Sequence, residues 1–90
     1  MNQVKLLSEF LGTFLLILSI LASGGNALFV GLTLSLVIFF TAKTSGGHAN
    51  PAVSLVMFLK KKLTMEEFAS EVVAQILGGT VCLYMFKALA

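Results

Sequence analysis

The sequence predicts an all-α membrane protein with three transmembrane helices and one re-entrant half-helix, in a single domain over residues 1–90. Hydrophobic residues make up 58% of the chain and charged residues only 11%, and the mean hydropathy is +1.01. A water-soluble chain of this size could not bury so much apolar surface, so we expect the lipid bilayer to be its solvent. Three long apolar runs predict the transmembrane helices, and a shorter run after a glycine-rich loop predicts the half-helix.

The composition also excludes several classes of function. The net charge is only +2 and all six cationic residues are lysines, so we expect no nucleic-acid partner, because phosphate recognition favours arginine. Cys82 is the single cysteine, which excludes an internal disulfide and gives no metal cluster. The chain contains no nucleophile–base set and no cofactor loop, so we expect neither an enzyme nor a bound cofactor.

The first transmembrane helix is expected over about residues 6–22. We expect it to be retained rather than cleaved as a signal peptide, because Glu9 interrupts the apolar run and further spans follow. Ser8 and Gly12 are one helical turn apart, a spacing that lets membrane helices approach closely. An ionisable side chain within a span costs about 2.5 kcal/mol or more. Glu9 should therefore face a partner or a cavity, unless it lies near enough to the interface to reach water.

A tight turn over residues 23–26 leads into the second transmembrane helix, expected over about residues 27–42. This run carries no charge and covers about 24 Å at about 1.5 Å per residue, which is short but adequate for a thin bilayer. Gly31 and Ser35 repeat the small-residue spacing of the first helix. Lys43 ends the run.

The segment over residues 44–59 is too polar at its start to cross a membrane and too apolar at its end for an aqueous loop. Asn50 stands where a helix N-cap belongs, and Pro51 follows at the first helical position. A helix from Pro51 to Leu59 is about 13 Å long, around half of a hydrocarbon core about 30 Å thick. We therefore expect a re-entrant element, in which backbone enters the membrane and a half-helix returns to the same side, with its positive N-terminal end near the midplane.

The third transmembrane helix is expected over about residues 65–89. Thr64 and Glu67 fit a capping box at its start. Small residues at positions 70, 74 and 78 form a ladder that predicts a packing face. Glu71 and Gln75 lie beside this ladder, one turn apart. Glu71 is expected either to be solvated at the interface or to make a buried contact, and the sequence favours neither.

The placement of the lysines predicts the orientation in the membrane. With a cytoplasmic N-terminus, only Lys87 lies toward the outside, and the other lysines all lie inside: Lys5, Lys43, Lys60, Lys61 and Lys62. We therefore expect an integral, multi-pass membrane protein whose N-terminus is cytoplasmic and whose C-terminus is outside. The run of three lysines after the half-helix is expected to anchor this topology, and attraction to lipid head groups is secondary.

Three motifs in register resemble the aquaporin and glycerol-facilitator (major intrinsic protein) family. The segment SGGHANPAV over residues 45–53 resembles the asparagine-proline-alanine loop of the family's first repeat. EFLGTF over residues 9–14 resembles the first-helix pattern, and AQILG over residues 74–78 resembles the third-helix pattern. The resemblance covers essentially the whole chain, and it implies half of an aquaporin-like inverted-repeat fold.

The chain also departs from the family pattern. The family's fold has six spans and two such loops, whereas this sequence holds three spans and one loop, so it corresponds to the first half of a channel. Val53 follows the motif, as in the family's first repeat, where the second repeat carries an arginine. Because the chain contains no arginine, the family's cationic selectivity residue is missing. Glu71 also departs from the family, which usually has an aromatic or apolar residue near that position.

The resemblance implies roles for individual residues. Asn50 would point its amide into the pore as a hydrogen-bond donor, within the motif that Pro51 and Ala52 complete. Val30 falls at the family's second-helix selectivity position, where a valine would widen and dehydrate the constriction. Glu9 would hold the loop backbone in place, with Gln75 as a second buried polar residue. Carbonyl oxygens would form a ladder of acceptors at four loop residues: Gly46, Gly47, His48 and Ala49.

The function expected from this resemblance is that of a half-length channel subunit. It would oligomerise, with copies of itself or with a complementary half-channel, to pass water and small uncharged solutes such as glycerol. Pairing in the family's geometry needs one inverted copy, which the lysine bias opposes. The alternative is a non-conducting interaction subunit or remnant that needs a full-length relative. No metal site is expected at His48, because no second histidine, cysteine or carboxylate lies at ligand spacing in the sequence.

Overall fold

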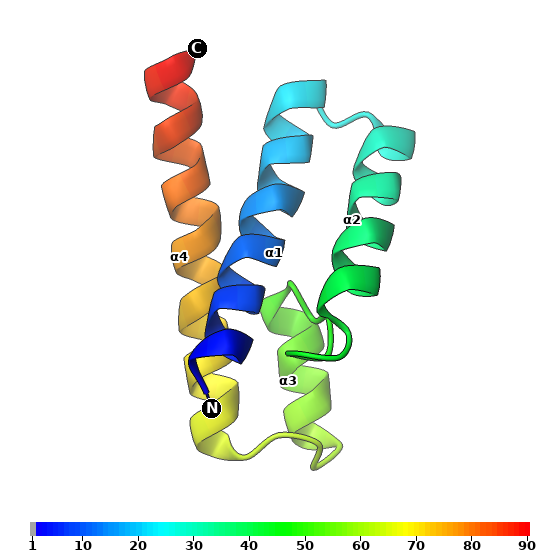
Figure 1. Cartoon of the computed structure of the whole chain (residues 1–90), viewed down its shortest axis with the longest axis vertical. Coiled ribbons are helices and arrows are strands. Elements are labelled where there is room, and N and C mark those ends of the chain that lie inside the picture. The colour runs from blue at the N-terminus through cyan, green and yellow to red at the C-terminus, as the bar shows by residue number, and fades with distance from the viewer. Residues whose placement is uncertain (1) are drawn as a thin grey trace.

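The computed structural model describes residues 2–90, which form four helices. They are α1 (Gln3–Ser23), α2 (Ala27–Thr41), α3 (Pro51–Leu59) and α4 (Met65–Leu89). α1 packs against both α4 and α2, and the short α3 packs against the first half of α4 (Figure 1). No other pair of helices within residues 2–90 is in close contact. α2 is therefore held to the other helices through α1 alone.

The helix ends follow from local capping groups. α1 begins three residues before the expected span because the side chain of Asn2 accepts a hydrogen bond from the Lys5 N–H. Gly24, in the left-handed region at φ 66°, ends α1, as glycine commonly does at helix C-termini. Asn26 caps α2 in the same way as Asn2 caps α1. α2 contains 15 residues and is about 22 Å long.

The capping groups predicted for the other two helices are confirmed. Asn50 is the N-cap of α3 and Pro51 is its first residue. The Thr64 hydroxyl accepts from the Glu67 N–H while the Glu67 carboxylate accepts from the Thr64 N–H, which completes a capping box. α3 ends at Leu59, before the run of three lysines. The expected bounds of both helices agree with the structure.

Small residues bring α1 and α4 together, as their spacing predicts. A Cβ atom added to Gly78 would lie 2.3 Å from the Phe10 carbonyl oxygen, so the two backbones meet at this point. Ala74, one turn earlier on α4, is buried as well. Gly31 on α2 behaves differently, because a Cβ added there would meet nothing within 4 Å. The small-residue face that contains Gly31 therefore packs against no other helix within the described chain.

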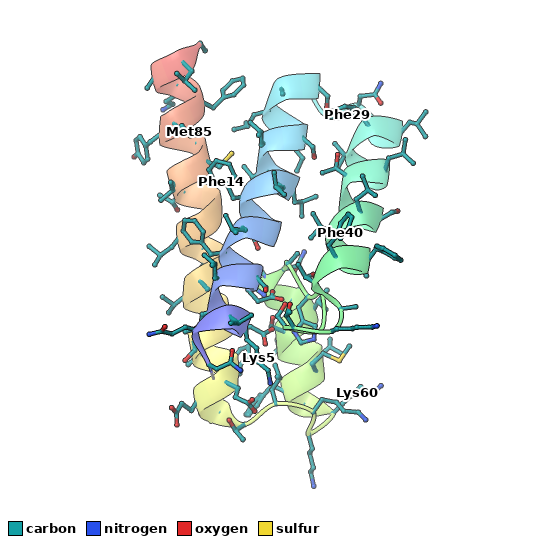
Figure 2. All side chains as sticks on the ribbon, viewed as in Figure 1. Lys5, Phe14, Phe29, Phe40, Lys60 and Met85 are labelled. Atoms are coloured by element: carbon teal, nitrogen blue, oxygen red, sulfur yellow. The ribbon has the colours of Figure 1, made fainter. Side chains whose placement is uncertain are left out.

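Polar side chains fill the interior and apolar side chains cover the outside. Glu9, Glu71 and Gln75 are among the largest fully buried side chains. By contrast, Phe39 and Phe40 on α2 are 75% and 73% exposed, and Figure 2 labels Phe40 near the end of α2 that leads into the loop. This distribution is the reverse of that in a water-soluble protein and suits a lipid environment. By length and composition, α1 and α4 are long and apolar enough to span a membrane, whereas α2 is a shorter apolar helix.

Candidate functional site

The candidate site is the loop over residues 42–50 together with the N-terminus of α3. Figure 1 shows α3 beginning near the middle of the molecule and running toward the end where α3 and α4 are joined. Gly46 and Gly47 adopt φ values of 89° and 68°, which glycine adopts without steric cost. A Cβ on Gly47 would lie 3.2 Å from the Ile38 Cα, so the loop turns back tightly against the last turn of α2.

Glu9 fixes the end of this loop from α1. Its carboxylate accepts hydrogen bonds from the backbone N–H groups of Ala49 at 2.8 Å and His48 at 3.3 Å. The Gln75 side chain donates a third hydrogen bond to the same carboxylate at 2.8 Å. These bonds support Ala49 in a left-handed conformation, at φ 52°, that a residue with a Cβ adopts only under constraint. Glu9 is 1% exposed. Of its two expected environments, the structure therefore shows the buried one with partners and not a position that reaches water.

Asn50 caps α3 and still keeps its amide group available. Its side-chain oxygen accepts from the N–H groups of Ala52 at 2.7 Å and Val53 at 3.4 Å. Because the oxygen satisfies the helix, the NH₂ group of the same side chain is not used in the cap. Asn50, Pro51 and Ala52 are all exposed on the surface of the chain. A hydrogen-bond donor is therefore presented beside the positive end of a helix.

A second carboxylate, that of Glu71, lies on the other side of the loop. Its Oε1 contacts His48 Nδ1 and accepts a hydrogen bond from the Ser54 hydroxyl at 2.7 Å. Gln75 Nε2 donates to Ser54 Oγ at 2.7 Å and so connects this carboxylate to that of Glu9. The result is one continuous polar network joining α1, the loop, α3 and α4. Glu71 is fully buried, so it makes a buried contact and is not solvated at the interface.

The structure brings together most, but not all, of the residues singled out from the sequence. Val30 lies in the first turn of α2, about 17 Å along the helix from the loop, so it forms no part of this cluster. Glu71 and Ser54 are functional candidates that sequence reasoning missed or left undecided. The one-turn spacing of Glu71 and Gln75 was the available signal, because it puts both side chains on one face of α4.

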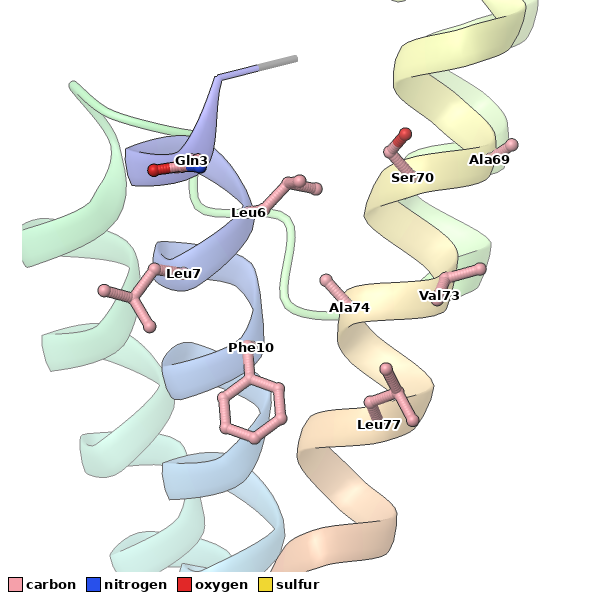
Figure 3. Close-up of a pocket in the computed structure, with 9 residues that line it drawn as sticks. All are labelled: Gln3, Leu6, Leu7, Phe10, Ala69, Ser70, Val73, Ala74 and Leu77. Atoms are coloured by element: carbon pink, nitrogen blue, oxygen red, sulfur yellow. The ribbon is translucent and has the colours of Figure 1, made fainter.

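A groove between the start of α1 and the first half of α4 offers a different kind of surface (Figure 3). Apart from Gln3 and Ser70, its lining is apolar: Leu6, Leu7, Phe10, Ala69, Val73, Ala74 and Leu77. Its lining contains no ionisable side chain, so we do not consider it a catalytic or metal-binding site. Its composition suits lipid or another apolar surface.

Comparisons with known proteins show which family the whole chain resembles. The Major intrinsic protein family model matches residues 1–90. The chain is 35% identical over 85 residues to the Glycerol uptake facilitator protein-like 6 of Lactiplantibacillus plantarum. It is 32% identical over 90 residues to Aquaporin NIP3-1 of Arabidopsis thaliana, and 33% identical over 90 residues to the Aquaglyceroporin AqpS of Rhizobium meliloti. No solved structure gave a significant match.

These matches cover most of this chain but a minor part of the relatives. They include 86%, 86% and 83% of this chain, and 39%, 28% and 39% of the respective relatives. The chain therefore spans less than half the length of the curated relatives it matches. Together with the apolar helices, the matches identify an integral membrane protein. The extent of the family match shows that the chain belongs to the major intrinsic protein family.

Proposed function

We propose that the chain supplies one half of a channel for water and small uncharged solutes such as glycerol. Family membership favours a channel over an enzyme, and the named relatives include a glycerol uptake facilitator and aquaporins. In this proposal α1, α2 and α4 cross the membrane, and the loop with α3 enters it from one side. α2 would cross at a place where the bilayer is thin, because its 15 residues cover only about 22 Å.

The observation that carries the proposal is that the two polar groups of the Asn50 side chain serve different purposes. Its oxygen caps α3, while its NH₂ group is left on the exposed face of the chain. A water molecule passing this point would accept a hydrogen bond from Asn50 and be oriented by it. The positive end of α3 would disfavour cations and protons at the same place. The loop carbonyls of residues 46–49 would continue the path as acceptors.

The proposed pore needs a second half. Irregular backbone is tolerated at membrane depth only where protein or water covers it, yet Gly46 and Asn50 are exposed in the single chain. A second copy of this chain, or a complementary half-channel, would cover them and supply the opposite wall. Without an arginine in this half, and with Val30 rather than a bulky residue on α2, we expect neutral solutes to pass as well as water.

The test is the permeability of proteoliposomes that contain the purified chain, measured by stopped-flow light scattering under water and glycerol gradients. The informative variant is Asn50→Asp, because aspartate caps a helix as well as asparagine but replaces the amide donor with an anion. The control is Asn26→Asp, since Asn26 caps α2 through the same oxygen contact, to the Phe29 N–H at 2.9 Å. We expect permeability well above that of empty liposomes, lost in Asn50→Asp and kept in Asn26→Asp.

The opposite result would favour a non-conducting interaction subunit. In that case the inserted, helical chain would leave the liposomes no more permeable than empty ones. The apolar outer surface of α2, which contacts only α1 among the described helices, would then serve for association with a relative. Equal permeability of the wild type and Asn50→Asp would instead show that Asn50 does not line the pore.

A further inference from the structure

The cluster of ionisable residues behind the loop has a property that the channel proposal does not use. Glu9, His48 and Glu71 come from α1, the loop and α4, and each offers one ligand atom within 4.8 Å of the other two. Because 39 residues separate the first two of these positions and 23 the last two, their spacing in the sequence does not reveal the cluster. We propose that these three side chains bind a divalent transition-metal ion, and we take Zn²⁺ as its probe.

First, Glu71 has an unused acceptor oxygen. Within residues 2–90, Glu71 Oε2 is buried and has no hydrogen-bond partner, and Gln75 Oε1 in the same network has none either. Glu71 is 0% exposed, so water at the protein surface does not satisfy this oxygen. A buried oxygen without a donor is costly, and a metal ion would satisfy it by coordination. The carboxylate of Glu71 is thus held in place through one oxygen while the other is free to bind.

Second, the charges of the cluster favour a bound cation. Two carboxylates meet one imidazole. Within residues 2–90, the only ion-pair contact of either carboxylate is that of Glu71 with His48, so no lysine pairs with them. With a neutral imidazole, the two ionised carboxylates carry a charge of −2, which is unfavourable in a buried site. A divalent ion brings the sum to zero. An imidazole nitrogen with two carboxylate oxygens is a donor set that zinc accepts, whereas Mg²⁺ prefers oxygen ligands alone.

Third, hydrogen bonds hold the two carboxylates in place. Ser54 donates to Glu71 Oε1, and the Ala49 N–H and Gln75 amide donate to Glu9 Oε1. Hydrogen bonds of this kind orient metal-binding carboxylates in proteins. The His48 side chain is 10% exposed, so one of the three ligand residues reaches the surface of the chain. An ion held here would tie the loop to both α1 and α4.

The experiment measures zinc binding directly, so it does not depend on whether the chain conducts. The purified chain in detergent is stripped with a chelator and dialysed, then titrated with Zn²⁺ by calorimetry, with thermal unfolding followed by circular dichroism. The variant is Glu71→Gln, which keeps the size of the side chain and its hydrogen bond with Ser54. The control is Glu66→Gln, an exposed carboxylate in the first turn of the same helix.

We expect one zinc ion per chain for the wild type and for Glu66→Gln, with a rise in unfolding temperature on binding. In Glu71→Gln the affinity should fall by at least about tenfold, because even the loss of a supporting group costs that much, and zinc should no longer raise the unfolding temperature. An excess of Mg²⁺ should not compete. The proposal is overturned if the stripped wild type binds no zinc, if Glu71→Gln binds it equally well, or if Glu66→Gln is impaired to the same degree.

Discussion

At the scale of single residues, the loop is held by a few buried acceptors. Glu9 alone satisfies the N–H groups of His48 and Ala49, which lie just before the capping residue of α3. A buried N–H without an acceptor costs about 1–3 kcal/mol, so we expect the backbone conformation of residues 48–49 to depend on this side chain. A carboxylate suits the position because it only accepts hydrogen bonds, and all three of its partners donate.

Replacing Glu9 with glutamine tests this dependence. Glu9→Gln keeps the size of the side chain but turns one of its two acceptors into an NH₂ group that faces a backbone N–H. We expect unfolding in metal-free detergent solution to become easier by about 1–3 kcal/mol. Amide hydrogen exchange, measured by mass spectrometry, should accelerate at residues 48–49. Glu66→Gln, at an exposed position, should exchange like the wild type. Unchanged exchange at residues 48–49 in Glu9→Gln would show that the loop keeps its shape without this acceptor.

At the scale of helices, local signals in the sequence predicted most of the architecture. Thr64 with Glu67, and Asn50 with Pro51, predicted where two helices begin, because capping depends on neighbouring residues alone. The structure begins α1 three residues before the expected start, because the side chain of Asn2 caps the helix. This difference is small, since an N-cap moves the end of a helix but does not decide whether the helix exists.

Contacts between distant segments could be predicted only in part. The resemblance placed Glu9 at the loop, but nothing predicted that Glu71 would meet His48, which lies 23 residues away. That contact depends on how α4 is rotated against α3, and the spacing of residues along one helix does not determine this rotation. Gly31 shows the same limit, because its spacing with Ser35 is typical of a packing face and yet no helix of the described chain covers it. Spacing predicts which residues share a face but not what lies against that face.

Two glycines therefore give opposite predictions for the same substitution. In Gly78→Ala the added Cβ would lie 2.3 Å from the Phe10 carbonyl oxygen, so α1 and α4 must separate. We expect a loss of about 1–3 kcal/mol in stability, the usual cost of overpacking. In Gly31→Ala the Cβ meets nothing within 4 Å, and alanine favours a helix by about 1 kcal/mol.

Thermal unfolding of the two variants in detergent, followed by circular dichroism, compares these expectations. Gly78→Ala should unfold at a clearly lower temperature than the wild type, and Gly31→Ala at the same temperature or slightly higher. Equal unfolding temperatures for the two variants would mean that α1 and α4 do not meet at Gly78. A large loss in Gly31→Ala would mean that this face of α2 is covered after all, as in an oligomer that persists in detergent.

At the scale of the whole molecule, most charged groups lie either in the interior or toward one end. Glu9 and Glu71 are inside, whereas Figure 2 shows Lys5 and Lys60 toward the end where α3 meets α4. Lys87 lies in the last turn of α4, at the opposite end of the chain (Figure 1). Lysines gathered at one end favour a single orientation in the membrane, with that end in the cytoplasm. A pore made of two copies in opposite orientations would have to overcome this bias.

The orientation of the chain can be measured with cysteines at its two ends. Glu66→Cys lies at the lysine-rich end and leaves every lysine in place, and Ala90→Cys lies at the opposite end. Both positions are exposed, whereas the natural Cys82 is 0% exposed, so the wild type serves as the unlabelled control. With a membrane-impermeant maleimide on intact cells, we expect Ala90→Cys to react at once and Glu66→Cys to react only after permeabilisation. That outcome would leave a complementary half-channel, or a parallel assembly of copies, to complete the pore. Partial labelling of both variants in intact cells would contradict the lysine argument, because it would show two orientations in one membrane and make the inverted pair available.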